Sequence, residues 1–379
     1  MKADRTMRLL DRYIAKNFLV GYFISFFVLI GMCITLDLFV NIDEFVEQSG
    51  QGKGVLLRHI LSYYGPQTAL WFRHLAGMIT VIAAVFSLAR MTKNNELIAV
   101  MASGISLKRI LAPILLLAVL LMGLQIADEE FLIPRLASDL TRGRDEIGQP
   151  RRFPFWFISS PEGHLFCGRE YNESTRTVED AFVILRQQDA SGQRWTVIGQ
   201  VEAARAVYDA SRKGWVLEHG RRMNVLPEQE GPTSLTSVEP IDFLASNLRP
   251  EDIGLRRQEG YKSLLSFGQI EELLNYPGTR KTDLAELILQ KHSRIVDPIM
   301  NLIVLMAALP VLIRRDPKEI KSAILISFLT TLGCFLTVFL CKLFATESIG
   351  GQVWPEIWVW APVFLFLPIA LLQIDAMKT

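Results

Sequence analysis

Ionisable side chains inside long apolar stretches are the residues of this sequence best placed to do chemistry. Arg73 and His74 stand about two turns inside the apolar run 66–90. The other members of this set are Asp37, Asp128, Glu129, Glu130, Arg294, Asp297 and Lys342. A charge within a membrane costs about 2.5–3.5 kcal/mol on insertion scales, so such groups usually face a polar cavity or an opposite charge.

Two interpretations of these groups remain open. In the first, basic side chains border a polar cavity suited to an anionic amphiphile, and the candidates for lipid binding are Arg73, His74, Arg294 and Lys342. In the second, the groups reach the membrane surface or pair with one another. We favour the second for Lys342 and the acidic triplet 128–130. Asp37 lies at a depth similar to that of Arg73 and is a candidate partner for it.

No other pattern in the sequence points to catalysis or to a metal. The four cysteines, at 33, 167, 334 and 341, show neither disulfide nor zinc spacing, and the five histidines are scattered. The segment GQGKG at 50–54 has a lysine among glycines but lacks the spacing of a phosphate-binding loop. The net charge of +1 gives no basis for nucleic-acid binding. We therefore expect a non-catalytic chain without a metal or cofactor.

Six stretches are apolar enough to cross a bilayer, which requires about 20 residues. They are 15–40, 66–90, 109–133, 292–313, 321–344 and 354–374. Lys and Arg concentrate near the N-terminus and around the loops 91–108 and 314–320, whereas the loops 41–53 and 345–353 contain only Lys53. Because cytoplasmic loops are enriched in Lys and Arg, both termini and the two basic loops are predicted to face the cytoplasm.

The long interval between the third and fourth spans has a different character. Short runs rich in Val, Ile, Phe, Trp and Tyr alternate with turn sequences such as DASGQ at 189–193 and DASRKG at 209–214. This pattern predicts an antiparallel all-β domain, a sandwich or jelly-roll-like fold, on the far side of the membrane. The predicted boundaries are 1–134 for the first three spans, 135–265 for the β domain, 266–291 for connecting helices and 292–379 for the last three spans.

The segment NNELIAVMASGIS at 94–106 predicts a short cytoplasmic helix between two spans, at about 94–104. Glu96 lies in its first turn, where a negative charge is favourable. Leu97, Val100 and Met101 form an apolar face. Such a helix can dock into a groove on a soluble partner, as coupling helices do in ATP-driven transporters. The alternative is an interfacial helix that lies on the bilayer, with Glu96 as a cap.

Three segments together resemble one known family. LLDRYIAKNFL at 9–19, NNELIAVMASGISLKRIL at 94–111 and LQKHSRIVDPIMNLIVLMAALPVLI at 289–313 are similar to stretches of the LptF/LptG (YjgP/YjgQ) permeases. The order of three spans, a β-rich insert and three more spans also resembles that family. The resemblance implies a permease subunit of an ABC transporter in the bacterial inner membrane. Such a transporter extracts lipopolysaccharide, or a related glycolipid, from the outer leaflet and passes it to a periplasmic bridge.

The resemblance also implies partners and residue roles. The expected partners are a paralogous permease subunit or a second copy, a cytoplasmic ABC ATPase dimer that uses the ATP, and a periplasmic jelly-roll bridge or single-span accessory protein. Glu96, Leu97, Val100 and Met101 would couple to the ATPase. Basic residues near the outer rim of the cavity, Arg73 and His74 above all, would meet the lipid phosphates. The β domain would extend strand to strand with a similar fold, through an exposed sheet edge within 155–200.

One stretch departs from the family pattern, and two alternatives remain. The family leads us to expect lysines after the first span, but the sequence there reads DLFVNIDEFVEQ. The basic side of the site would then come from the partner chain, or the lipid would differ. A membrane-anchored scaffold whose β domain binds envelope partners is the main alternative. An ion-coupled secondary transporter ranks last because the carboxylates sit at span ends and the two halves show no obvious similarity.

Overall fold

The computed structural model describes residues 2–48, 53–142, 152–189, 195–225, 235–257, 260–275, 281–312, 320–347 and 354–376. The turn predicted at 189–193, most of GQGKG and nearly all of the 314–320 loop lie outside these ranges. The chain divides into two compact units. The membrane unit comprises residues 1–43, 64–134 and 288–379, and the sheet unit comprises residues 44–63 and 135–287.

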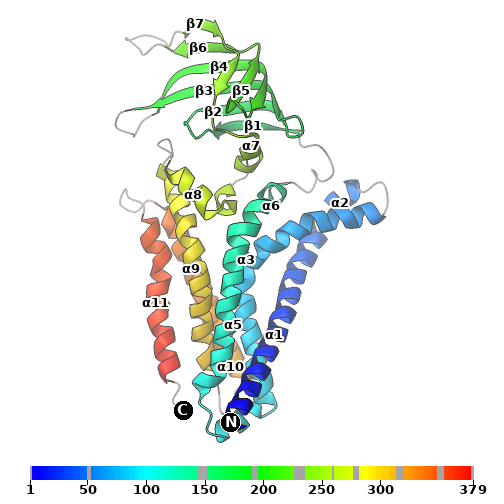
Figure 1. Cartoon of the computed structure of the whole chain (residues 1–379), viewed down its shortest axis with the longest axis vertical. Helices are drawn as coiled ribbons and strands as arrows, with labels where there is room; N and C mark the ends of the chain where they lie inside the picture. Colours follow the sequence, from blue (N-terminus) through cyan, green and yellow to red (C-terminus); the bar gives the residue numbers. More distant parts are fainter. Residues whose placement is uncertain are drawn as a thin grey trace. The chain divides into compact units, whose positions relative to one another are not determined.

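The six predicted spans are confirmed as six long helices (Figure 1). They are α1 (Lys2–Val40), α3 (Lys53–Lys93), α5 (Leu107–Ala127), α9 (Lys281–Leu312), α10 (Ile320–Thr346) and α11 (Pro355–Ala376). Two helices extend beyond the apolar runs. α3 begins at Lys53 and continues through Pro66. The third span continues through a π-helical segment, η1 (Asp128–Leu132), into α6 (Ile133–Leu140). Hydropathy detects only the apolar part of a helix, so polar extensions escape it.

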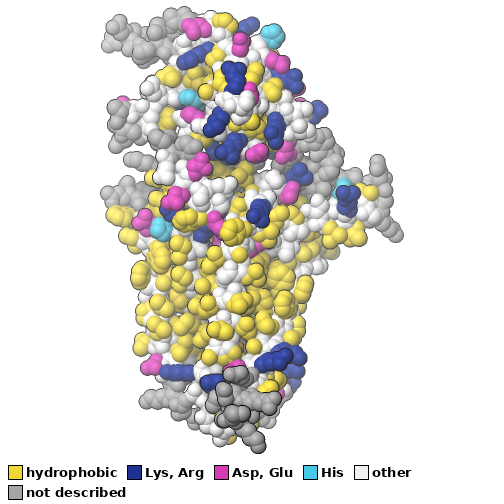
Figure 2. Space-filling view, in the orientation of Figure 1, with side chains coloured by type: hydrophobic (Ala, Val, Ile, Leu, Met, Phe, Trp, Pro, Cys, Tyr) yellow, Lys and Arg dark blue, Asp and Glu magenta, His cyan; other side chains and the backbone are white. Residues whose placement is uncertain are grey.

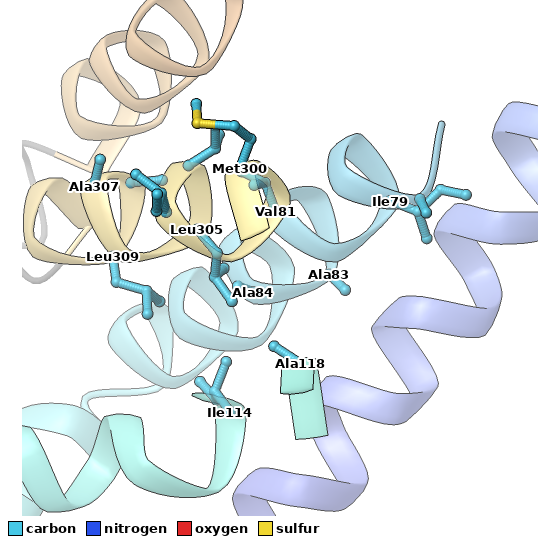
Figure 3. Packing of buried hydrophobic residues seen from close by; sticks show 14 of the residues in the cluster. Ile79, Val81, Ala83, Ala84, Ile114, Ala118, Met300, Leu305, Ala307 and Leu309 are labelled. Carbon is cyan, nitrogen blue, oxygen red and sulfur yellow. The ribbon is translucent and has the colours of Figure 1, made fainter. Parts of the chain in front are cut away.

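The core of the membrane unit lies where α3, α5 and α9 meet (Figure 3). Ala83, Ala84, Ala118 and Ala307 are buried there among larger side chains. Small residues let helix backbones approach closely within a membrane. Gly21 of α1 shows the same principle, because a Cβ built there would lie 3.2 Å from the Ala83 carbonyl oxygen.

The surface of the membrane unit fits a bilayer. Hydrophobic side chains cover most of its helices, and Lys and Arg gather at the end where the two termini lie (Figures 1 and 2). In the most apolar windows of α1 and α10, only 11% and 17% of residues are buried within the chain. These two helices therefore present apolar surface to lipid or to another protein, because no described part of their own chain covers it.

The inserted all-β region is also confirmed, as one antiparallel eight-stranded sheet (Figure 1). Its strands are β1 (Arg152–Ser159), β2 (Leu165–Asn172), β3 (Thr177–Gln188), β4 (Trp195–Asp209), β5 (Gly214–Glu218), β6 (Arg221–Val225), β7 (Leu235–Pro240) and β8 (Phe243–Ala245). The order is β1-β2-β3-β4-β5-β8, and β6 pairs with both β4 and β7. Within the described strands, β1, β7 and β8 each have a single partner, so they form the free edges of the sheet.

Aromatic residues build the core of the sheet unit and also tie the sheet to the helices after it. Tyr171 and Trp215 are both 1% exposed. The Tyr171 hydroxyl donates to the Pro250 carbonyl at 3.0 Å, and the Trp215 indole N–H donates to the Leu248 carbonyl at 3.2 Å. Each ring thus fills the core while its polar atom is satisfied. The remaining elements of this unit are α2 (Ile42–Gln48), α7 (Pro250–Arg256), the 3₁₀ segment η3 (Tyr261–Leu264) and α8 (Phe267–Leu274).

Candidate functional site

The ionisable residues of the spans converge on one level of the membrane unit. At a helical rise of about 1.5 Å per residue, Arg73, Glu129, Arg294 and Lys342 stand about 27–33 Å from the ends of their helices nearest the termini. That distance matches the hydrocarbon thickness of a bilayer, about 30 Å. These charged residues of four helical segments therefore lie at the same membrane boundary, the one opposite the termini. We call them, together with His74, Asp128, Glu130 and Asp297 beside them, the polar cluster.

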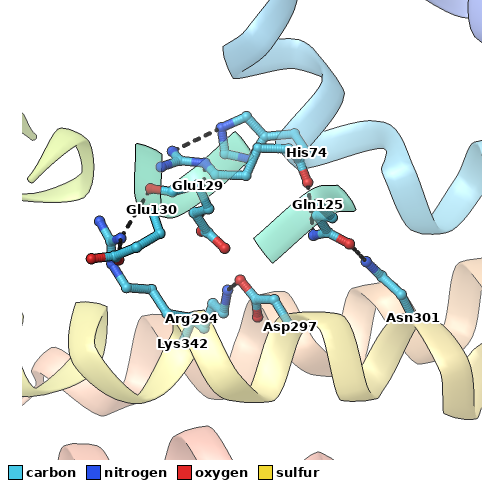
Figure 4. A network of polar contacts seen from close by, with 9 residues as sticks. His74, Gln125, Glu129, Glu130, Arg294, Asp297, Asn301 and Lys342 are labelled. Atoms are coloured by element: carbon cyan, nitrogen blue, oxygen red, sulfur yellow. Dashed lines mark hydrogen bonds and ion pairs between the residues drawn. The ribbon is translucent and has the colours of Figure 1, made fainter. Parts of the chain in front are cut away.

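Each cation of the polar cluster meets a carboxylate of the same chain (Figure 4). Lys342 Nζ donates to Asp297 Oδ2 at 2.6 Å, and Arg294 Nη1 donates to Glu130 Oε2 at 3.0 Å. Arg73 Nε lies 4.0 Å from Glu129 Oε1. Burial of a charge in a membrane is costly, and pairing at these distances offsets part of that cost.

The π-helical segment explains how three consecutive acidic residues can serve this cluster. η1 begins at Asp128, and both Asp128 and Glu129 are buried. The Glu129 carbonyl oxygen also accepts a hydrogen bond from Arg294 at 3.0 Å. A π-turn widens the helix locally and changes the direction of its side chains, and such turns are frequent at functional sites. Apolar periodicity gives no sign of one.

Beside the charges lies a layer of neutral polar groups. Gln125, which is 2% exposed, accepts from the Asn301 amide at 2.9 Å and donates to the Arg73 carbonyl at 3.4 Å. A Cβ at Gly77 would lie 2.1 Å from Asn301 Oδ1, so glycine makes room for this amide. His74 Nε2 lies 3.4 Å from Arg73 Nη2. These contacts join α3, α5 and α9 around the charged pairs.

The polar cluster contains both carboxyl groups and permanent cations. Its carboxylates are Asp128, Glu129, Glu130 and Asp297, and its permanent cations are Arg73, Arg294 and Lys342. Several buried atoms of these residues have no hydrogen-bond partner among the described residues, namely Asp128 Oδ2, Glu129 Oε2, Asp297 Oδ1, and Nε and Nη2 of Arg294. Buried polar atoms are normally satisfied. The cluster therefore retains both donors and acceptors for further contacts.

At the opposite end of the membrane unit lies the short helix α4 (Glu96–Ala102). It begins after Asn95, which adopts a left-handed conformation with φ 58°. Glu96 is held by two neutral donors: the Tyr13 hydroxyl of α1 reaches Oε2 at 2.9 Å, and the Asn94 amide reaches Oε1 at 3.1 Å. These donors orient the carboxylate without neutralising its charge.

Comparison of the sequence with models of known protein families identifies the family of this chain. The sequence model of the lipopolysaccharide export system permease LptF/LptG matches residues 12–374, nearly the whole chain. The chain belongs to the LptF/LptG family. Curated proteins gave no match to it. Both α4 and the polar cluster lie within the matched range.

The structure corrects one prediction for this LptF/LptG chain. Leu97 was expected to belong to an apolar face that docks on a partner, but it is fully buried in the core of the membrane unit. Val100 and Met101 pack against the same core. The apolar face of α4 is therefore buried against the helices of its own chain and is not available to a partner. The outward face carries Ala99 and Ala102 instead, with Glu96 half-buried at its edge.

The four lipid-binding candidates of the LptF/LptG chain, Arg73, His74, Arg294 and Lys342, lie at the polar cluster, three of them labelled in Figure 4 and Arg73 in contact with His74 and Glu129. The pairing that we favoured for Lys342 is present. Asp37, suggested as a partner of Arg73, accepts from the Tyr64 hydroxyl at 2.8 Å, and the carboxylate beside Arg73 is Glu129. The sequence interpretation overlooked Gln125 and Asn301, although amides within apolar spans were a signal that could have revealed them.

Proposed function

We propose that this chain is the membrane subunit of an ABC-type transporter that extracts lipopolysaccharide from the outer leaflet of the bacterial inner membrane. Membership of the LptF/LptG family supports an export permease in that membrane, and six apolar helices fit a multi-pass subunit. The energy would come from ATP hydrolysis on a separate cytoplasmic ATPase dimer. A second permease chain, paralogous or identical, would complete the membrane part.

The observation that carries this proposal is the arrangement around Glu96. α4 lies at the end of the membrane unit where Lys and Arg gather, and this basic end is the one expected in the cytoplasm. There the Glu96 carboxylate is fixed by hydrogen bonds from Tyr13 and Asn94. A fixed carboxylate at an accessible helix terminus suits a cationic side chain of a partner. We assign that partner as the ATPase.

The lipid would leave the membrane at the level of the polar cluster. There Arg294 and Lys342 would exchange part of their contact with Glu130 and Asp297 for the anionic groups of the lipid. Two features support this exchange. The Lys342 and Asp297 side chains are 31% and 28% exposed, so their pair is accessible, and Arg294 holds two unused buried nitrogen atoms. Arg73 and His74 would hold the neighbouring layer in place.

The sheet unit would pass the lipid to a periplasmic bridge or accessory protein by strand addition at a free edge. Within the predicted interval 155–200, β2 and β3 are paired on both sides, so β1 is the strand there that offers an edge. β7 and β8 are the further candidates outside that interval. Crosslinkers on β1 and β7 of an active complex should capture the neighbouring protein, and crosslinkers on β3 should not.

Co-purification tests the proposed function. The chain is isolated from the inner membrane with its neighbours, and the Glu96→Ala variant is isolated in parallel. We expect an ATPase with the wild-type chain and a several-fold smaller amount with the variant, because loss of a charge-assisted contact costs about 1.5–3 kcal/mol. Ala99→Ser, on the outward face of α4, is the matched control. Equal recovery of the ATPase with Glu96→Ala would refute the assignment of Glu96. Recovery of envelope proteins without any ATPase would favour a membrane-anchored scaffold.

A further inference from the structure

Helix α9 belongs to both compact units of the chain. Its residues 281–287 lie in the sheet unit, and its residues 288–312 lie in the membrane unit. No proline or glycine occurs in the sequence between Asp283 and Asp297. Because sharp helix kinks arise mainly at such residues, this part of α9 is expected to behave as one stiff rod.

The first turns of α9 are bound to a buried lysine. Lys262 of η3 is 7% exposed, and its ammonium group donates to Asp283 Oδ1 at 2.7 Å and to Glu286 Oε2 at 2.6 Å. The spacing of three residues places both carboxylates on one face of α9. Lysine is almost never buried this deeply unless it is paired. These three side chains, which we call the lysine triad, therefore fix the rotation of α9 about its axis relative to η3.

η3 is in turn connected to the sheet through α7. Arg256 of α7 donates to the Ser159 carbonyl oxygen of β1 at 2.6 Å. Leu255 of α7 and Tyr261 of η3 pack against a buried apolar cluster that also contains Leu287 of α9. Apolar contacts are non-directional and allow sliding, whereas charge-assisted hydrogen bonds have a preferred geometry. The lysine triad therefore supplies a directional contact between α9 and the rest of the sheet unit.

The face of α9 that carries the lysine triad also carries residues of the polar cluster. Asp283 and Arg294 are 11 positions apart, and so are Glu286 and Asp297. Eleven residues make about three helical turns, so the members of each pair lie on nearly the same side of α9, about 16 Å apart along its axis. Arg294 and Asp297 take part in ion pairs of the polar cluster. A rotation or shift of α9 when those ion pairs rearrange would therefore move the carboxylates of the lysine triad as well.

From this arrangement we infer that Lys262 is a positioning residue for lipid transfer, which holds the sheet unit on α9 so that a movement of α9 at the polar cluster also moves the sheet unit. The inference rests on the proposed function, because it assigns the sheet unit a movement that accompanies lipid release. In this role Lys262 touches neither the lipid nor the ATPase. Its removal should therefore leave ATP hydrolysis intact and lower the amount of lipid transferred.

Pulsed electron spin resonance on the full-length chain in phosphatidylcholine nanodiscs tests the lysine triad without transport. Spin labels are placed at Val197 on β4 and at Ile295 on α9, which are 45% and 46% exposed, in a chain whose four cysteines are replaced by alanine. The distribution of distances between the labels should broaden in Lys262→Met, because methionine keeps the apolar stem of the side chain but forms no ion pair.

Two further variants separate loss of the ion pair from loss of the fold. Lys262→Glu should broaden the distribution too, and Lys262→Glu combined with Glu286→Lys should restore it, because the pair is formed again with its charges exchanged. Arg205→Met is the matched control. It removes an ion pair between β4 and β5, that of Arg205 with Glu218 at 3.6 Å, and should leave the distribution unchanged.

Lipopolysaccharide transferred per ATP hydrolysed, measured with the reconstituted complex, tests the role in transfer. Lys262→Met should lower this ratio at least about fivefold, because loss of a charge-assisted hydrogen bond weakens a contact about tenfold or more. The exchanged pair should restore the ratio. The rate of ATP hydrolysis should stay unchanged in all these variants, and so should the resistance of the sheet unit to proteolysis.

An unchanged distance distribution in Lys262→Met, or a distribution that the exchanged pair fails to restore, would overturn the inference. Equal transfer per ATP by Lys262→Met and wild type would overturn it as well and leave the proposed function intact. Conversely, broadening as expected in a chain whose wild-type complex shows no ATP-driven transfer would uphold the lysine triad as the contact that holds α9. It would refute the proposed function and, with it, the role of Lys262 in transfer.

Discussion

The ion pair between Arg294 and Glu130 gives the sharpest test of the polar cluster. The Arg294 side chain is 8% exposed and that of Glu130 is 30% exposed, and their atoms are 3.0 Å apart. Removing one partner of a buried pair costs about 3–5 kcal/mol, because the other charge is left without compensation. In Glu130→Ala, Arg294 would keep its bond to the Glu129 carbonyl, so we expect the free energy of unfolding to fall by about 2–3 kcal/mol.

A double-mutant cycle measures this quantity. Unfolding by sodium dodecyl sulfate in mixed micelles is followed for wild type, Glu130→Met, Arg294→Met and the double Met variant, which close the cycle, and for Glu130→Ala beside them. The single change Glu130→Ala should raise the unfolding constant roughly 30- to 150-fold, since about 1.4 kcal/mol corresponds to a factor of ten. The double variant should lie within about 1 kcal/mol of wild type, because apolar replacement of a whole buried pair is often neutral.

Lys108→Met supplies the matched control at the other end of the membrane unit. Lys108 pairs with Asp375 at 2.9 Å, but the two side chains are 51% and 86% exposed. An exposed pair contributes about 0–1 kcal/mol, so little change is expected. If Glu130→Ala proves as mild as Lys108→Met, or if the double variant is as unstable as Glu130→Ala, then the polar cluster is not a set of coupled buried pairs.

Three further predictions concern other parts of the chain. Tyr13→Phe should reduce ATPase recovery about two- to tenfold through loss of one hydrogen bond to Glu96. It should have no further effect in a Glu96→Ala background, which lacks the acceptor, and additive effects would contradict this. Gly21→Val should lower the free energy of unfolding, measured in the same detergent assay, by about 1–3 kcal/mol, because the Ala83 backbone of α3 lies too close for a larger side chain. An unchanged free energy of unfolding would show that α1 can shift away from α3. Burial, together with the nearby Arg186, lowers the pKa of His164 even though Glu162 acts in the opposite direction. The unfolded chain therefore takes up a proton at a higher pH than the folded chain, and the sheet unit should lose stability as the pH falls below about 6.5. Thermal unfolding of His164→Gln, measured over the same pH range, should lack this pH dependence.

The sequence was sufficient to predict the architecture, because spanning a bilayer and forming a sheet each require a distinct hydrophobic pattern along the chain. Six apolar runs predicted six helices, and alternating aliphatic and aromatic runs between turns predicted the inserted sheet. What the patterns did not contain is the pairing of specific side chains. The separation of Arg294 and Glu130 by 164 positions is visible only once α9 and η1 are packed together.

Other features were missed for local reasons. Periodicity identified Leu97 as part of an apolar face, but it cannot say whether that face packs against the same chain or another. Apolar periodicity does not mark the π-turn at Asp128, and it does not mark the positive φ of Phe157, 56°, at a register shift between β1 and β2. A cavity of about 400 Å³ lies between β1 and the elements α7, η3 and α8, and its walls come from residues about 100 positions apart, so no single segment of the sequence could reveal it.

Reconstituted lipid release tests the central claim most directly. The chain, its partner permease and the co-purified ATPase are placed in proteoliposomes that contain lipopolysaccharide, and transfer of the lipid to a soluble periplasmic acceptor is measured with and without ATP. We predict ATP-dependent transfer by the wild-type complex, and several-fold less transfer per ATP hydrolysed when Glu96→Ala replaces the wild-type chain. Transfer that does not depend on ATP, or that proceeds equally without this chain, would contradict the account.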